Sequence, residues 1–206
     1  VDMYKSIVVS CDTYYYQVAA ETDVDDTARF LTQFGFGRPT GIDIDGEVAG
    51  VLPSRDWKRR RFAGAQYREE HRKWYLGDSI SAGIGQGYTA FTPLQLAHAM
   101  ATVANGGVAF RPHLVRTVES LRSGEKRLVA PEPSHTIPLN PEHVAMIRNA
   151  LVGVNKEGTS ARAFAGAAYT SGGFDYVAFL DKGKDVTAQA ASAKVVVVDL
   201  RGAQGW

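Results

Sequence analysis

Residues 83–106 have the sequence GIGQGYTAFTPLQLAHAMATVANG, which contains the clearest helix signal of the chain. Thr92 is a favourable N-cap and Pro93 fits the first helical turn. Asn105 and Gly106 are typical of a helix end. The helix predicted between them has one apolar face, formed by Leu96, Ala97, Met100, Val103 and Ala104.

Further helices are predicted on both sides of this segment. The apolar periodicity indicates helices over residues 2–10, 13–20 and 25–34, the last burying Ala28, Phe30 and Leu31. Asn140 opens another capped helix that closes at Gly153, with Val144, Ile147, Ala150 and Leu151 facing inward. A short helix is predicted over residues 159–164.

Strand signals occupy the remaining stretches. Residues 110–121 and 126–130 predict two strands joined by a polar turn at residues 123–125. Residues 176–180 and 194–200 are also strand-like, and the second is a continuous β-branched run typical of a strand buried on both faces. Residues 38–66, rich in glycine, proline and charge, indicate a long excursion with short strands rather than a helix.

The composition excludes several classes of protein. The 206 residues are 45% hydrophobic and 22% charged with a formal net charge of +1, which indicates neither disorder nor a nucleic-acid partner. The single cysteine, Cys11, excludes an internal disulfide or multi-thiolate metal site and is expected to be a small packing residue. Apolar runs are too short to span a membrane, and the N-terminus lacks a signal-peptide pattern, so any membrane anchor is expected outside this chain.

The tripeptide Ser10-Cys11-Asp12 lies at the joint between two predicted helices. A serine followed two residues later by an amide or carboxylate can relay a proton to a leaving group while the second side chain holds a nearby lysine. The same residues are also common helix N-caps, which is the simpler interpretation when the tripeptide is considered alone.

Several longer stretches resemble a known family, the transpeptidase domain of class B penicillin-binding proteins of the cell-elongation type. The resemblance covers about residues 1–170. It is strongest in KWY at residues 73–75, in GIGQGY at 83–88 and in TPLQ at 92–95, with further matches in TGID at 40–43 and GVLPSRDWK at 50–58. These glycines are therefore interpreted as a tight turn near the rim of the active site rather than as a dinucleotide-binding loop.

The resemblance implies an α/β fold of the serine beta-lactamase and penicillin-binding type, with a central, mostly antiparallel sheet covered by helices on both faces and here incomplete. It also implies peptidoglycan cross-linking through an acyl-serine intermediate, with D-Ala-D-Ala stem peptides as substrates and beta-lactams as mimics of them. Ser10 and Asp12 match the second of the superfamily's three motifs, S-x-N, and are the catalytic candidates.

The first motif, S-x-x-K, supplies the nucleophile and the base on one helical face. In the family it lies upstream of the position of Ser10. The one literal match in this chain, Ser123 to Lys126, falls in a predicted hairpin turn, and we expect a solvated turn there. The resemblance implies a serine-type enzyme, but this chain is expected to be inactive because the segment with the nucleophile is absent from it.

The third motif, K-T-G, has only a partial counterpart. Residues 183–189, GKDVTAQ, keep the frame of G-K-T-G-T-A-Q but have Asp185 and Val186 in place of threonine and glycine. Lys184 and Thr187 are the substrate-binding candidates if this is a degenerate motif, and an unrelated or rearranged tail is the alternative. The expected organisation is a partial transpeptidase domain over residues 1–173, with residues 174–206 as divergent C-terminal strands of the same domain.

No cofactor or metal is expected, because His71, His98, His113, His135 and His143 lack ligand spacing. The basic cluster at residues 58–61 and 68–73 is expected to be a solvated loop, with anionic glycan or lipid headgroups as the alternative contact. By resemblance the partners are stem peptide, beta-lactams and membrane proteins of the elongation machinery, and the location is the periplasmic face of the inner membrane. A noncatalytic remnant that binds stem peptide or those partners, or a truncated gene product, are the alternative functions.

Overall fold

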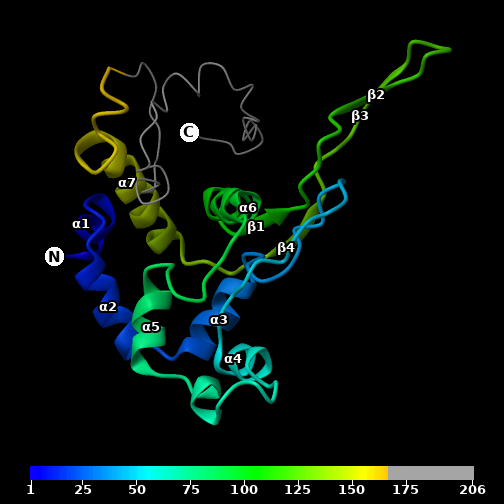
Figure 1. Cartoon of the computed structure of the whole chain (residues 1–206). Coiled ribbons are helices and arrows are strands. Elements are labelled where there is room, and N and C mark those ends of the chain that lie inside the picture. The colour runs from blue at the N-terminus through cyan, green and yellow to red at the C-terminus, as the bar shows by residue number, and fades with distance from the viewer. Residues whose placement is uncertain (167–206) are drawn as a thin grey trace. The chain divides into compact units, whose positions relative to one another are not determined.

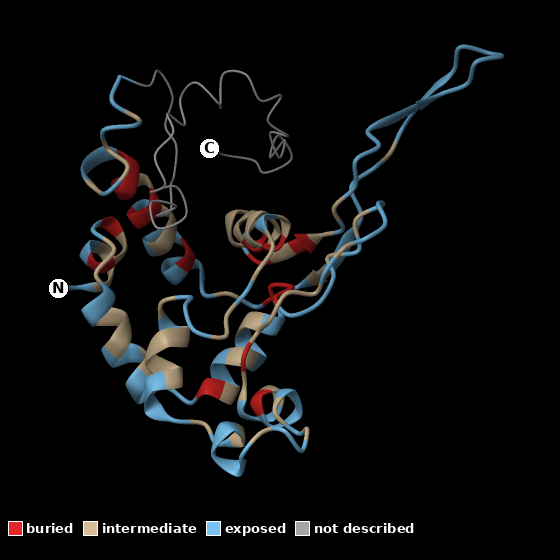
Figure 2. Ribbon diagram, in the orientation of Figure 1, coloured by how far each residue is buried: buried red, intermediate tan, exposed pale blue. Residues whose placement is uncertain are grey.

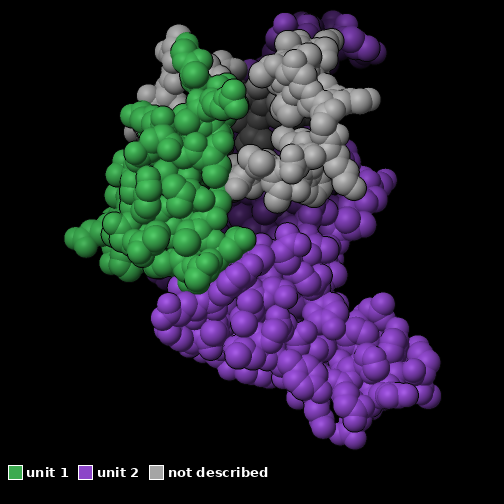
Figure 3. Space-filling model, turned by 60° about the vertical axis from the view of Figure 1, so that its left-hand side comes forward, with its two compact units in different colours: residues 1–14, 139–206 green, residues 15–138 purple. Residues whose placement is uncertain are grey.

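The computed structural model describes residues 1–166 (Figure 1). The strands predicted at residues 176–180 and 194–200 lie outside the described residues. The chain divides into two compact units (Figure 3). One comprises residues 1–14 and 139–206, of which 139–166 are described, and the other comprises residues 15–138.

The first unit is built on helices α1, Met3–Val8, and α7, Pro141–Glu157. Asp2 caps α1 by accepting a hydrogen bond from Lys5 N at 2.7 Å, and Asn140 caps α7 by accepting one from Glu142 N at 2.8 Å. The predicted inward face of α7 is confirmed for three of its four residues, whereas Ile147 is half-buried. The apolar core of this unit contains Val8, Val144, Ala150, Leu151 and Val154 (Figure 2).

The prediction that α7 ends at Gly153 is wrong, because the helix continues to Glu157. Gly153 is buried in the contact with α1, and a Cβ at this position would lie 2.5 Å from the Tyr4 Oη and 2.7 Å from Val8 Cγ2. The glycine therefore permits close approach of two helices rather than ending one. The short helix predicted over residues 159–164 is also absent, and hydrogen-bonded turns occupy that stretch.

The second unit contains most of the helices. They are α2, Asp12–Glu21, which begins in the first unit, α3, Val24–Thr32, α4, Arg55–Arg61, the 3-10 helix η1, Glu69–Arg72, α5, Leu76–Gly83, and α6, Pro93–Ala104. The expectation that residues 38–66 contain no helix is wrong, because α4 forms there. Ser54 caps this helix, and its Oγ accepts a hydrogen bond from Trp57 N at 3.0 Å. Phe30 of α3, predicted to be buried, is half exposed.

Helix α6 begins where the sequence predicts, with Thr92 and Gln95 forming a reciprocal capping box. Its predicted apolar face is only half-buried, and the buried residues are Gln95, Ala99 and Thr102. Gln95 is buried because its Nε2 donates to Arg38 O at 2.8 Å and to Ala49 O at 2.9 Å. Hydrogen bonding to the loop, rather than apolar periodicity, thus determines which side of α6 faces inward.

The described strands form two antiparallel pairs. Strand β1, Val108–Phe110, pairs with β4, Pro133–Thr136, and β2, Thr117–Glu119, pairs with β3, Lys126–Leu128. The predicted hairpin is thereby confirmed, with shorter strands than the sequence indicated. Residues 1–166 form an α/β arrangement with these small antiparallel sheets, and no larger central sheet is formed within that range.

Candidate active site

The Ser10-Cys11-Asp12 tripeptide joins two helices, as the sequence predicted. Helix α1 ends at Val8 and helix α2 begins at Asp12. The joint is held by backbone hydrogen bonds from Ser10 N to Ile7 O at 3.3 Å and from Cys11 N to Ser6 O at 2.9 Å. The backbone therefore fixes the position of Ser10 relative to α1.

Ser10 has a left-handed backbone conformation, with φ of 53°. It is the one non-glycine residue with positive φ in the described part of the chain. A side chain in this region costs about 1–2 kcal/mol and usually marks a turn or a functional position. Ser10 is half-buried, and its hydroxyl forms no hydrogen bond with another described residue.

Asp12 is exposed at the first position of α2. The partial positive charge at a helix N-terminus stabilises a carboxylate placed there. The simpler N-cap interpretation fits neither residue as such, because Asp12 is already helical and Ser10 lies two residues before the helix. A free hydroxyl and a carboxylate at one joint are the groups that a proton relay requires.

The joint is supported by contacts between α1 and the end of α7. The Tyr4 hydroxyl donates to Glu157 Oε1 at 2.8 Å, and this hydrogen bond to the carboxylate raises the pKa of Tyr4. Thr159 N donates to Val8 O at 3.3 Å, and Gly158 lies so close to the same carbonyl that no Cβ would fit. The sequence prediction missed these positioning residues, whose only signal is the Glu-Gly-Thr run after a long helix.

The residues that match the other two motifs lie in two places. Lys184 and Thr187 lie outside the described residues, so their relation to Ser10 stays a prediction. Ser123 is in the exposed β2–β3 turn, where its Oγ accepts from Glu125 N at 3.3 Å. Lys126 pairs instead with Glu119 at 3.4 Å, so the Ser123–Lys126 match is a solvated turn, as predicted.

Two members of the basic cluster at residues 58–73, Lys58 and Arg72, are engaged within the chain. Lys58 is buried, with its Nζ 2.6 Å from Asp78 Oδ2 and within 5.2–5.7 Å of the ring centroids of Trp74, Tyr75 and Tyr88. Arg72 donates to Phe62 O at 2.9 Å at the end of α4. The expected solvated loop is therefore wrong for residues 58–61, which belong to α4 with Lys58 buried, whereas the side chains of Arg59, Arg60, Arg61 and Arg68 are exposed.

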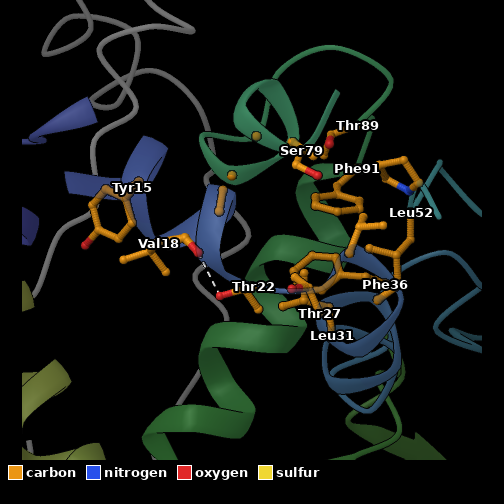
Figure 4. A pocket seen from close by; sticks show the side chains of 17 residues that line it. Tyr15, Val18, Thr22, Thr27, Leu31, Phe36, Leu52, Ser79, Thr89 and Phe91 are labelled. Atoms are coloured by element: carbon orange, nitrogen blue, oxygen red, sulfur yellow. Dashed lines mark hydrogen bonds between the residues drawn. The ribbon is translucent and has the colours of Figure 1, made fainter. Parts of the chain in front are cut away.

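A pocket of about 370 Å³ lies in the second unit and does not include Ser10 or Asp12 (Figure 4). Its walls are mainly apolar and include Val18, Leu31, Phe36, Leu52 and Phe91. Within residues 1–166 no group of three or more histidine, cysteine, aspartate or glutamate side chains could hold a metal ion. No described helix is long and apolar enough to cross a membrane.

Comparison with known proteins identifies the family. Residues 1–173 match the family model described as the penicillin binding protein transpeptidase domain. The Haemophilus influenzae peptidoglycan D,D-transpeptidase MrdA is 38% identical over 200 residues, covering 94% of this chain and 27% of the relative. The chain spans about a quarter of the length of the curated relatives it matches.

Solved structures show the same fold. Pseudomonas aeruginosa PBP2, solved in complex with WCK 5153, has a TM-score of 0.68 and 34% identity, covering 82% of this chain and 36% of that one. Helicobacter pylori PBP2, solved in complex with MreC, has a TM-score of 0.64 and 27% identity, covering 82% and 29%. The chain therefore belongs to the transpeptidase domain family of the penicillin-binding proteins, within the elongation type of class B.

Proposed function

We propose that this chain supplies the proton-relay part of a peptidoglycan D,D-transpeptidase, which cross-links stem peptides through an acyl-serine intermediate. Ser10 relays the proton between the nucleophile's base and the leaving group, and Asp12 orients the neighbouring lysine. Two observations carry the proposal: Ser10 is held in a left-handed conformation at a helix joint, and its hydroxyl has no hydrogen-bond partner among the described residues.

The substrates and partners of the proposed enzyme follow from its relatives. D-Ala-D-Ala stem peptides are the acyl donors for the nucleophilic serine of the S-x-x-K motif. Beta-lactams acylate that nucleophile because they imitate the D-Ala-D-Ala end of the stem peptide. Membrane proteins of the elongation machinery are the protein partners, supported by the complex of Helicobacter pylori PBP2 with MreC. The site of action is the periplasmic face of the inner membrane. Lys184 and Thr187 bind the substrate carboxylate in this proposal.

The 206-residue polypeptide alone is not expected to react with penicillin. Its S-x-x-K match lies in a solvated turn, and loss of the serine from a comparable catalytic unit costs about a millionfold in rate. Incubation with a fluorescent penicillin followed by denaturing electrophoresis tests this, and a covalently labelled band would refute it. A chimera in which residues 1–173 replace the matching segment of the Haemophilus influenzae relative is expected to be labelled.

A noncatalytic role in binding stem peptide is the second candidate function. It is favoured by Asp185 and Val186, which replace the threonine and glycine of the third motif. These two residues lack the hydroxyl and the close backbone approach that the third motif supplies for turnover, so they disfavour catalysis. Saturable binding of a D-Ala-D-Ala peptide by a chimera that carries residues 1–206, and that penicillin does not label, would favour this role over the enzymatic one.

A further inference from the structure

Helix α1 ends two residues before Ser10, and the hydrogen bonds of its last carbonyl groups fix where it ends. A helix leaves its last four carbonyls without partners inside the helix. Backbone amides of residues 9–11 donate to three of them, those of Lys5, Ser6 and Ile7. The fourth, Val8 O, accepts from Thr159 N at 3.3 Å, and Thr159 lies two residues beyond the end of α7. The last hydrogen bond of α1 is therefore supplied by α7 and not by the joint itself.

Gly158 allows the chain after α7 to reach this carbonyl. A Cβ at position 158 would overlap Val8 O and would lie 2.9 Å from Val154 O. The φ of Gly158 is −103°, which other residues adopt without strain, so the glycine is required by space and not by backbone conformation. Alanine at this position can be accommodated only if the Val8 carbonyl, and with it the end of α1, moves away from α7.

The Tyr4 side chain makes a second contact between these two helices, which lie side by side in Figure 1. Its Oη would be 2.5 Å from a Cβ at Gly153, so the side chain passes directly over that glycine. The same hydroxyl donates to Glu157 Oε1 at 2.8 Å, about one helical turn further along α7. Residues 157–159 thus contact α1 through both a side chain and the backbone.

We propose that Gly158 is a positioning residue for Ser10. By admitting the Val8 carbonyl to the Thr159 amide it fixes the end of α1, and through this the place of the Ser10 hydroxyl. Glu157 supports the same placement through Tyr4. The inference rests on the proposed function, because that function gives Ser10 the proton relay, and it adds what holds the relay in position. Neither Gly158 nor Glu157 touches the substrate.

A proton relay is sensitive to a displacement of this kind. The relaying group has to lie within about 2.6–3.2 Å of its partner, and a misplacement of about 1 Å can cost about a hundredfold in rate. Ser10 N donates to Ile7 O at 3.3 Å, so Ser10 is tied to the last turn of α1. A shift of that turn is therefore passed on to Ser10 and is not absorbed between them.

Hydrogen exchange in the 206-residue chain tests the placement without reference to catalysis. The amides of Ser10 and Cys11 are the reporters, because each donates to a carbonyl of α1. Gly158→Ala is expected to speed their exchange about tenfold, equivalent to the loss of about one net hydrogen bond. Gly77→Ala is the control, since Gly77 is exposed and a Cβ there has no atom within 4 Å. Exchange that is equally fast in both variants would overturn the proposal.

The exposed Glu157 offers a milder pair of variants in the full-length chimera with the Haemophilus influenzae relative. Glu157→Ala removes the acceptor of the Tyr4 hydroxyl and is expected to lower the rate constant of acylation by a fluorescent penicillin about threefold. Glu157→Gln keeps an acceptor oxygen and is expected to retain the unsubstituted rate. Equal rates for the two variants would contradict the proposal. Circular dichroism checks folding, and this pair decides if Gly158→Ala does not fold.

A double-mutant cycle in the same chimera separates the positioning role from the proposed function. Gly158→Ala is expected to lower the rate constant of acylation about 10–100-fold when Ser10 is present. Combined with Ser10→Ala it should lower the rate by no more than about twofold further, because its effect acts through Ser10. A general structural defect would lower both by the same factor, and that result would overturn the inference. If Ser10→Ala alone leaves the rate unchanged, the proposed function fails instead, and the exchange of the Ser10 and Cys11 amides still decides the placement.

Discussion

At the scale of single residues, Ser10 combines an unfavourable backbone conformation with a hydroxyl that is proposed to act in catalysis. Its φ of 53° is a region that glycine occupies freely and β-branched residues avoid. The helix joint predicted from the sequence is confirmed, and the chemical role of Ser10, which rests on the S-x-D pattern, stays a prediction. The sequence could not predict the left-handed conformation, which depends on how α1 and α2 are joined.

Substitutions at Ser10 are expected to affect stability according to backbone conformation. Ser10→Gly should leave the free energy of unfolding unchanged or raise it by up to about 1 kcal/mol, whereas Ser10→Val should lower it, because β-branched side chains are the most disfavoured in this region. Urea unfolding monitored by circular dichroism measures the difference. Equal stability of the two variants would show that Ser10 is not held in the left-handed region.

At the scale of secondary-structure elements, hydrogen bonds and close approaches explain most departures from the sequence prediction. Helix α6 was predicted correctly in extent, because its capping signals are local. Its buried side was not predicted, since Gln95 reaches carbonyls more than 40 residues away in sequence. Gly153 was mistaken for a helix end because sequence alone does not reveal that α1 packs against it.

Gln95 is expected to be the residue on α6 whose loss costs most. Gln95→Leu leaves the carbonyls of Arg38 and Ala49 without their donor, and each buried unpaired group costs about 1–3 kcal/mol. Gln86→Leu, the same change at an exposed position, should alter the free energy of unfolding by no more than about 0.5 kcal/mol. Similar losses for the two variants, measured by urea unfolding, would contradict the role given to the Gln95 amide.

At the scale of the whole molecule, acid is expected to destabilise the fold. The Arg55 side chain lowers the pKa of Asp23, and the hydrogen bond from Leu114 N lowers that of Asp43. Burial acts to raise the pKa of Glu47, but hydrogen bonds from Thr40 and Gly41 outweigh it and lower that pKa. A carboxylate with a lowered folded-state pKa stabilises the fold above its unfolded-state pKa, and this contribution disappears as the pH falls through the folded-state value.

The free energy of unfolding should therefore decrease below about pH 4, the ordinary range of carboxylates. Glu47→Gln is expected to reduce the slope of this decrease, because one of the contributing carboxylates is gone. Glu70→Gln is the control, since Glu70 is exposed and its carboxylate accepts no hydrogen bond from the described residues. Urea unfolding from neutral pH down to about pH 3 provides the comparison. Identical slopes for all three proteins would contradict the assignment.

The family could be recognised from the sequence because its motifs are contiguous runs, as at residues 83–95. The relation of Ser10 to Lys184 could not be established in the same way, since it depends on packing between segments more than 170 residues apart. The proton-relay role of Ser10 is accordingly the claim on which the functional account depends.

The rate of acylation by a fluorescent penicillin tests that role most directly. In the full-length chimera with the Haemophilus influenzae relative, Ser10→Ala should lower the second-order rate constant by about 10²–10⁴-fold, the usual contribution of a general acid–base group. Ser123→Ala, which removes the serine of the solvated turn, should leave it unchanged. Acylation of the Ser10→Ala chimera at the unsubstituted rate would contradict the account.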